Sequence, residues 1–204
     1  MEFQDVVRRR RMVRAFHDRP LAAADVDRIL DNAVRAPSAG FSQGWAFLVL
    51  EGAEETARLW AAIAHGTPHH THVYNAPLVV VCLSHKDAYL DRYARPDKGW
   101  TDRDEARWPA PYWDIDTGFA ALLMLLTAVD AGLGGLFFGI VPERVDAFRD
   151  AFAVPAAYKP IGAVAIGYAD VAADRPSASL RLGRRPLREV MHRGRWRPAA
   201  EGPR

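Results

Sequence analysis

The chain has 204 residues, half of them hydrophobic and a quarter charged, which suits one compact domain with a substantial core. Its 27 basic and 25 acidic residues leave a formal net charge of +2, a smaller basic excess than nucleic-acid-binding domains usually carry. The single cysteine, Cys82, excludes an internal disulfide framework and a cysteine-rich zinc site, and it favours a reducing, cytoplasmic setting.

The spacing of apolar residues predicts helices and strands that interleave irregularly. Because two helices precede the first strand, an α+β sandwich with a sheet covered by helices fits better than a doubly wound fold. No internal repeat is present, so we expect a single domain over residues 1–204. In chain order, helices are predicted over 2–9, 22–35, 53–64, 116–131 and 142–152, and strands over 46–50, 77–83, 135–138 and 161–168.

The helix predicted over residues 116–131 contains the longest apolar stretch, Phe119 to Val129. A membrane-spanning helix needs about 20 such residues, so we interpret this one as a helix buried on most sides and closed by Gly132 as a C-cap. The N-terminal residues lack the apolar core of a secretion signal. These features favour a protein that is neither exported nor embedded in a membrane.

Two segments show no helix or strand pattern. Residues 85–113 place six tyrosines and tryptophans among charges and prolines, and we expect an aromatic lid or insertion there because long loops in compact domains tend to be functional. Residues 170–204 are rich in proline, arginine and alanine. They predict an extended tail that needs another surface to lie on.

Three short motifs carry candidate chemistry. Residues 8–14 (RRRRMVR) bring five guanidinium groups together, and arginine forks match phosphate oxygens in a bidentate manner. Residues 36–45 (APSAGFSQGW) form a polar loop whose amides and hydroxyls suit a planar heterocycle, and residues 184–190 (RRPLREV) add a second basic cluster. Taken singly, each basic motif is more typical of a solvent-exposed charged segment. The loop, taken singly, is typical of an ordinary connection between a helix and a strand.

In their order along the chain, these motifs resemble the nitroreductase-like FMN-dependent oxidoreductase family. The resemblance rests on a basic run ending in Arg-x-Phe, the APSAGxSQxW loop, Gly-Leu-Gly followed by a strand, and RRPLxEV in the tail. It covers nearly the whole chain, with residues 85–113 the least familiar part. It implies an α/β sandwich with a central mixed, mostly antiparallel sheet flanked by helices, in an intertwined homodimer that holds FMN at the subunit interface.

The resemblance also implies a reaction. A hydride from NAD(P)H reaches flavin N5 and passes on, in ping-pong fashion, to a small aromatic or quinone-like electron acceptor. The protein then needs no nucleophile, so no catalytic side chain is predicted, and Cys82 in its apolar strand is expected to be a core residue.

Five arginines match family positions that approach the flavin. Arg10 and Arg11 match those near the phosphate and ribityl chain, and Arg14 matches the basic residue near the N1/C2 carbonyl pole. Arg184 matches the tail arginine that returns to the phosphate, with Arg185 as the alternative if the alignment slips by one. Several arginines suit a phosphate that carries close to two negative charges.

Three further positions match family contacts made through the backbone or a loop. Pro37 and Ser38 match loop positions that reach the flavin from the partner subunit. Gly139, after the strand GGLFF, matches the glycine whose backbone N–H lies beside the N5 edge.

Three departures from the family pattern bear on binding. Met12 and Phe41 stand where serine and asparagine are frequent, which removes a hydroxyl near the phosphate and a polar contact to the ring. Gly44 replaces a proline and loosens the loop. We expect Phe41, together with Trp108 and Trp113 of the aromatic segment, to contact substrate.

Other interpretations remain open. A flavin- or deazaflavin-binding protein without NAD(P)H turnover, acting in flavin storage or degradation, is the alternative function, and a nucleic-acid-binding module using both basic ends is a third. His65, His69, His70 and His72 have spacings that zinc sites use, but no adjacent carboxylate completes a set, so a metal-free histidine cluster is favoured.

Overall fold

The protein is described by a computed structural model that covers residues 1–64 and 71–197. One four-stranded sheet lies at its centre, and its three pairs of neighbouring strands are all antiparallel. The extended segment at Met12 adds a parallel bridge to Gly135 at one edge. The predicted α+β class with a mostly antiparallel sheet is therefore confirmed. The strands run in the order β1 (Trp45–Glu51), β2 (Leu78–His85), β4 (Tyr158–Gly167) and β3 (Gly134–Phe138).

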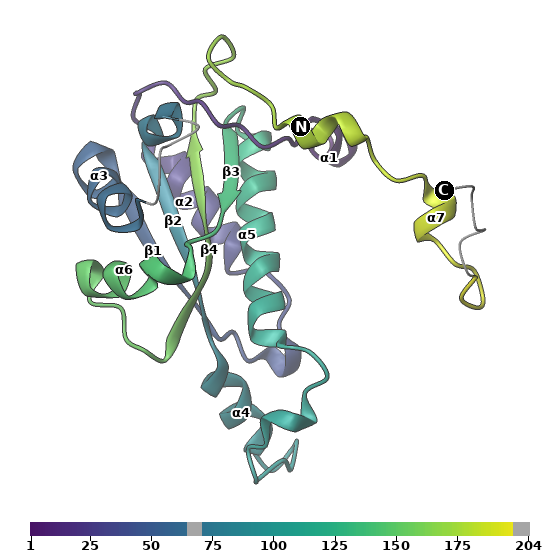
Figure 1. Cartoon of the computed structure of the whole chain (residues 1–204). Helices are drawn as coiled ribbons and strands as arrows, with labels where there is room; N and C mark the ends of the chain where they lie inside the picture. The colour runs from purple at the N-terminus through teal and green to yellow at the C-terminus, as the bar shows by residue number, and fades with distance from the viewer. Residues whose placement is uncertain (65–70, 198–204) are drawn as a thin grey trace.

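Helices cover both faces of this sheet (Figure 1). On one face, α2 (Ala23–Ala33) and α5 (Tyr112–Asp130) pack against Leu78, Val80 and Cys82 of β2. On the other face, α3 (Gly52–Ile63) and α6 (Val145–Phe152) pack against the alternate residues of the same strand. Successive side chains of a strand point to opposite faces, so the continuous apolar run of β2 fills both halves of the core.

Helix α5 is the longer of the two helices that cover the first face. It is long and apolar enough to span a membrane by length and composition, but more than half of it is buried. Ala120, Met124 and Ala128 are fully buried against the sheet, which explains its composition. The helix ends as predicted, because Gly132 takes a left-handed φ of 74° and the next amide, Leu133 N–H, donates to the Ala128 carbonyl at 2.8 Å.

The aromatic segment 85–113 differs from its prediction. It contains a nine-residue helix, α4 (Lys86–Ala94), and a short 3₁₀ turn, η3 (Glu105–Arg107), and α5 already begins at Tyr112. Trp108 lies at the centre of an aromatic cluster, with five other rings at centroid distances of 4.5 to 6.0 Å. Tyr89 and Tyr93 of α4 pack into this local cluster, so the segment shows no ordinary amphipathic stripe.

The two ends of the chain lie outside the sandwich. Helix α1 (Phe3–Arg9) leads into the first layer, and the C-terminal tail runs away from the body (Figure 1). The tail contains η5 (Ala178–Leu182) and α7 (Leu187–Val190) and leaves its apolar side chains exposed. Of the predicted histidine cluster, His65, His69 and His70 fall outside the described residues. The remaining short turns are η1 (Ala39–Phe41), η2 (Thr71–Asn75), which carries His72, and η4 (Pro142–Arg144).

Candidate flavin site

The basic run continues from α1 as an extended segment along the free edge of β3. Val13 N–H donates to the Gly135 carbonyl at 3.0 Å, next to the Met12 bridge. Side chains alternate along such a segment, and here Val13 is buried while Arg10 and Arg14 are only partly so. The segment therefore presents Arg10, Met12 and Arg14 on one side, at the strand that leads to Gly139.

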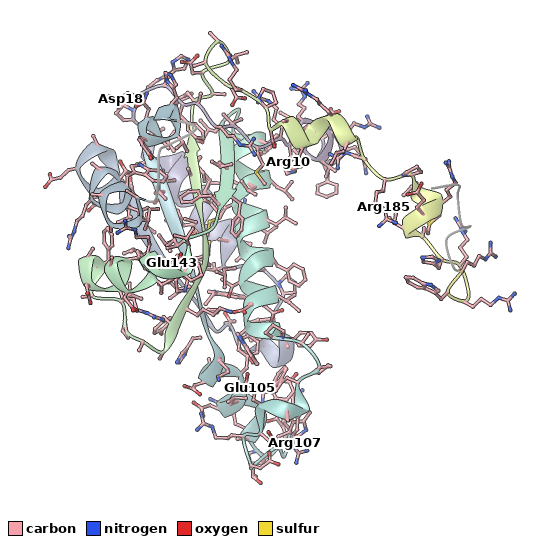
Figure 2. The ribbon with its side chains drawn as sticks, in the orientation of Figure 1. Arg10, Asp18, Glu105, Arg107, Glu143 and Arg185 are labelled. Carbon is pink, nitrogen blue, oxygen red and sulfur yellow. The ribbon has the colours of Figure 1, made fainter. Side chains whose placement is uncertain are left out.

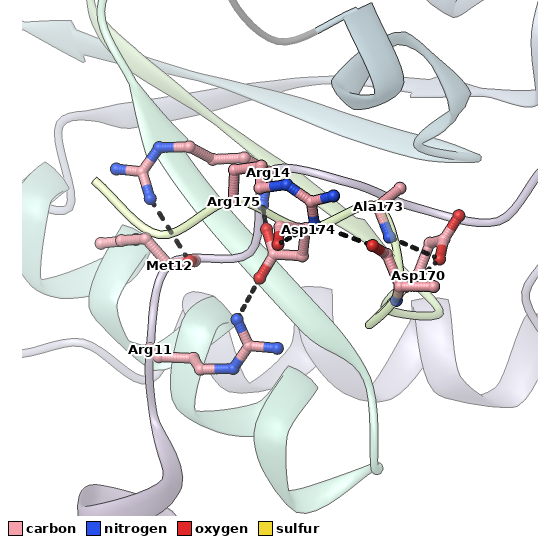
Figure 3. A network of polar contacts seen from close by, with 8 residues as sticks. Arg11, Met12, Arg14, Asp170, Ala173, Asp174 and Arg175 are labelled. Carbon is pink, nitrogen blue, oxygen red and sulfur yellow. Dashed lines mark hydrogen bonds and ion pairs between the residues drawn. The ribbon is translucent and has the colours of Figure 1, made fainter. Parts of the chain in front are cut away.

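A buried carboxylate that the motifs did not reveal, Asp174, organises these arginines (Figure 3). It forms an ion pair with the Arg11 guanidinium and accepts a hydrogen bond of 2.8 Å from the Arg14 amide. The side chain of Asp174 is only 3% exposed. Burial raises the pKa of Asp174, but the hydrogen bonds from Arg11 and Arg14 outweigh it and hold the pKa below its usual range. Asp174 thus keeps its charge and fixes the backbone that carries Arg14.

This pairing divides the predicted arginines into two groups. Arg11 points toward Asp174, whereas Arg10 has no ion pair within the described residues, and Arg14 makes one long hydrogen bond, 3.4 Å, to the Met12 carbonyl. Arg10 and Arg14 therefore keep guanidinium N–H groups for an anion.

The end of β3 adds an apolar edge and a backbone donor. Leu136, Phe137 and Phe138 are partly buried, and the Phe137 amide donates to the sulfur of Met12 at 3.5 Å, so Met12 lies against this strand. Gly139 follows, exposed, and a Cβ added there would have no atom within 4 Å. Within the described residues its amide makes no hydrogen bond, so a planar ring has access to it.

The loop with Pro37 and Ser38 is strained. Phe41 and Gln43 have left-handed φ values of 56° and 49°, which costs a residue other than glycine about 1–2 kcal/mol each. Ser38 Oγ accepts from the Gln43 amide at 3.1 Å and stabilises the turn from within. The Phe41 side chain, 75% exposed, projects from this turn. Such a conformation persists only where the surroundings hold it.

One protomer does not bring these two parts together. The loop is tied to the beginning of α5, where Asp116 accepts from the Ala39 amide at 2.8 Å, and the basic run lies beyond the helix's other end, at Gly134. Between Asp116 and Asp130 the helix rises about 20 Å, at 1.5 Å per residue. The structure therefore assembles Arg10, Arg11 and Arg14 beside β3, but leaves Pro37 and Ser38 at a distance.

The tail arginines also lie away from the basic run. Arg185 is carried out from the body and lies apart from Arg10 in Figure 2. Its guanidinium contacts Glu189 of α7 at 3.5 Å, so its ion pair is local to the tail. The predicted convergence of both ends on one phosphate does not occur within a single protomer.

Two hollows within the described residues do not supply a complete site either. One of about 420 Å³ lies between α2, α3 and η2, and one of about 440 Å³ lies between α1, α2 and α5. Neither is lined by Arg14 or by Gly139.

An exposed apolar face runs along α5. Ile115, Phe119 and Leu122 follow helical spacing and are 37%, 43% and 45% exposed, and Phe3 of α1 is 66% exposed. Monomeric proteins rarely leave such a stripe open to water.

Comparisons with known proteins agree with this architecture. The profile of the Nitroreductase family matches residues 7–168. A candidate NADH dehydrogenase/NAD(P)H nitroreductase from Archaeoglobus fulgidus is 29% identical over 189 residues, which is 92% of this chain and 94% of that protein. The crystal structure of a nitroreductase family protein from Clostridium difficile 630 has a TM-score of 0.72 at 25% identity, covering 96% of this chain and all of that one. A candidate nitroreductase from Desulfovibrio desulfuricans, solved in complex with FMN, has a TM-score of 0.71 at 22% identity and covers 97% and 99% of the two chains.

Proposed function

The chain belongs to the nitroreductase family, and from this premise we propose that it is an FMN-dependent NAD(P)H oxidoreductase that reduces an aromatic or quinone-like electrophile. We further propose that it works as a homodimer in the cytoplasm. The observation that carries the proposal is the segment with Arg10 and Arg14, which is bridged at Met12 to the edge of β3, the strand that ends at the open amide of Gly139.

The donor set fits a phosphorylated flavin. Arg10 offers a guanidinium to the phosphate and ribityl chain, and Arg14 places a fixed positive charge near the N1/C2 carbonyl pole. The Gly139 N–H is the donor we assign to the N5 edge, and the apolar residues at the end of β3 would line that face. When bound, FMN would supply hydride transfer through N5. Arg11 supports the site through Asp174 rather than as a phosphate ligand of its own.

A second copy of the chain would complete the site. Pro37 and Ser38 lie at the opposite end of α5 from Arg14, so two copies of α5 packed in opposite directions bring the loop of one protomer to the β3 edge of the other. The exposed stripe on α5 provides the apolar surface for that packing. The tail, which leaves its own body, would carry Arg184 or Arg185 to the partner's phosphate (Figure 1).

The substrate side follows from the same loop. Phe41 is 75% exposed on its strained turn and is the aromatic residue best placed to stack on a planar acceptor. Trp113 is buried and Trp108 lies within the aromatic cluster. We therefore assign these two tryptophans the role of shaping the substrate side, as part of the segment packed against the loop.

Two named relatives support the cofactors. The Desulfovibrio desulfuricans protein was solved with FMN, and the Archaeoglobus fulgidus protein carries an NAD(P)H nitroreductase name. Their coverage of nearly the whole chain makes a shared cofactor the simplest interpretation.

The absorption spectrum of the purified protein tests the proposal. We expect a yellow protein that retains FMN through gel filtration and loses its colour on anaerobic addition of NADH or NADPH, and regains it when a quinone is added. A yellow protein indifferent to both nucleotides would favour flavin storage or degradation. A colourless protein with no affinity for FMN, and with salt-sensitive binding to duplex DNA, would favour the nucleic-acid interpretation.

A further inference from the structure

The strained loop of residues 37–44 is held by contacts from outside as well as by its own hydrogen bonds. Its central turn takes left-handed backbone at Gly40 and at Phe41, so local preferences do not fix its shape. Contacts from α4 and α5 reach it at several atoms, and they identify side chains to which neither the motifs nor the proposed flavin contacts assign a role.

The central contact is a buried carboxylate shared by two donors. One oxygen of Asp116, on α5, accepts from the Ala39 amide at 2.8 Å and from the Tyr89 hydroxyl, on α4, also at 2.8 Å. Asp116 is 3% exposed and Tyr89 is fully buried. A buried carboxylate is unfavourable unless its oxygens are satisfied, so the Tyr89 hydroxyl and the loop amide constrain one another through it.

Two further contacts from α4 stabilise the turn at Gly40. Arg92 Nε donates to the Gly40 carbonyl at 2.8 Å, and the same guanidinium is held from behind by Asp97. The ring of Tyr93 lies so close to Gly40 that a Cβ there would come within 2.6 Å of it. The turn is therefore fixed by hydrogen bonds and by packing at once.

Gly44 makes room for this arrangement. A Cβ at Gly44 would lie 2.5 Å from a ring carbon of Tyr89 and 2.8 Å from the His85 carbonyl oxygen. The Gly44 carbonyl in turn accepts from the His85 amide at 2.8 Å, which ties the loop to the start of α4. The ring of Tyr89 thus occupies the space that a side chain at position 44 would need.

We propose that Tyr89 and Asp116 are positioning residues that hold the 37–44 loop in the conformation in which it meets the partner's flavin. The aromatic segment 85–113 then supports the loop conformation, in addition to the predicted role of a lid. This inference rests on the proposed function, because it assumes that Pro37 and Ser38 reach FMN. Displacing a group that contacts the reacting molecules by about 1 Å reduces reaction rates strongly. Loss of the Tyr89 hydroxyl should therefore have a measurable effect although it does not itself contact the flavin.

The test compares three variants of the full-length protein with the wild type. Tyr89→Phe removes the hydroxyl and keeps the ring, whereas Asp116→Ala removes the hydrogen bonds from both the Ala39 amide and the Tyr89 hydroxyl. Asp116→Asn keeps one acceptor oxygen and should disturb the loop less than Asp116→Ala does. The matched control is Asp114→Asn on the same helix, whose carboxylate binds Ser84 and Lys159 and makes no contact with the loop. Thermal unfolding of each variant verifies that it is folded.

Two readouts separate the loop from the cofactor. Hydrogen exchange of residues 38–44 in flavin-free protein reports the loop alone, and we expect about tenfold faster exchange in Tyr89→Phe and more in Asp116→Ala, with no change in Asp114→Asn. On the same proteins, the FMN affinity should fall and the KM for the acceptor should rise, in the same order of variants.

The outcomes are distinguishable. Unchanged loop exchange in Tyr89→Phe and Asp116→Ala would overturn the positioning role, whatever the wild type does with FMN. Faster exchange with unaltered FMN affinity and KM would overturn the link between the loop and the flavin. A wild type that fails to bind FMN at all would instead refute the proposed function, and the link with it.

Discussion

The apolar stripe of α5 offers the most direct test of the proposed dimer, through Phe119→Ala. About 43% of Phe119 is exposed in the single chain. For a side chain of about 200 Å² this leaves about 85 Å² for a partner to cover. At about 25 cal/mol per Å², the loss is about 2 kcal/mol per protomer and about 4 kcal/mol per symmetric dimer. The dimer Kd should therefore rise about a thousandfold.

Sedimentation velocity over a dilution series measures that Kd, and FMN fluorescence in the same samples reports cofactor release. Because the proposed site takes residues from both protomers, FMN should leave in step with dissociation into monomers. Val171→Ala is the control, since Val171 is 75% exposed on the turn after β4 and does not lie on the α5 face. If the Kd of Phe119→Ala stays within threefold of wild type, or if its monomers keep FMN, the reasoning that places this helix at the interface is wrong.

Three further substitutions probe the site itself. Arg14→Ala should weaken FMN binding by roughly 10- to 100-fold, the loss of one charge-assisted contact, and lower the reduction potential of the flavin in a potentiometric titration; if both stay unchanged, the placement of Arg14 is incorrect. The pKa of Asp174 is held below its usual range, so its stabilising effect is present above its unfolded pKa of about 4 and is lost as pH falls through the lower folded pKa. Asp174→Asn should therefore cost about 1 kcal/mol at pH 7 and flatten the acid limb of stability in urea titrations below about pH 4; an acid limb identical to wild type would contradict this. Gly44→Ala should lower the free energy of unfolding by about 1–3 kcal/mol because its Cβ meets the Tyr89 ring, and a loss below 0.5 kcal/mol would mean that the ring moves aside easily.

Much of the architecture could be predicted from the sequence. Strand β2 is a continuous apolar run because it is buried on both faces, and α5 is apolar because it packs on the sheet and leaves a further face open. The end of α5 followed from Gly132, whose left-handed conformation is a local property of glycine. The basic run was also evident, since five arginines in seven positions form a local signal.

Helix α4 was not predictable from periodicity. Tyr89 and Tyr93 pack in part into a cluster around Trp108, which comes from later in the chain, so their spacing does not describe one face of the main core. The aromatic content indicated an unusual segment, but not its helix.

The sequence by itself determined the layers, the local turns and the charge at the two ends, because these depend on neighbours within a few positions. The tertiary structure alone decided which aspartates matter. Asp174 meets Arg14 across 160 positions and Asp116 meets Ala39 across 77, and a lone aspartate has no spacing that reveals such a partner. It also decided that Arg14 and Ser38 lie at opposite ends of one helix, since only folding sets the distance between segments so far apart in sequence.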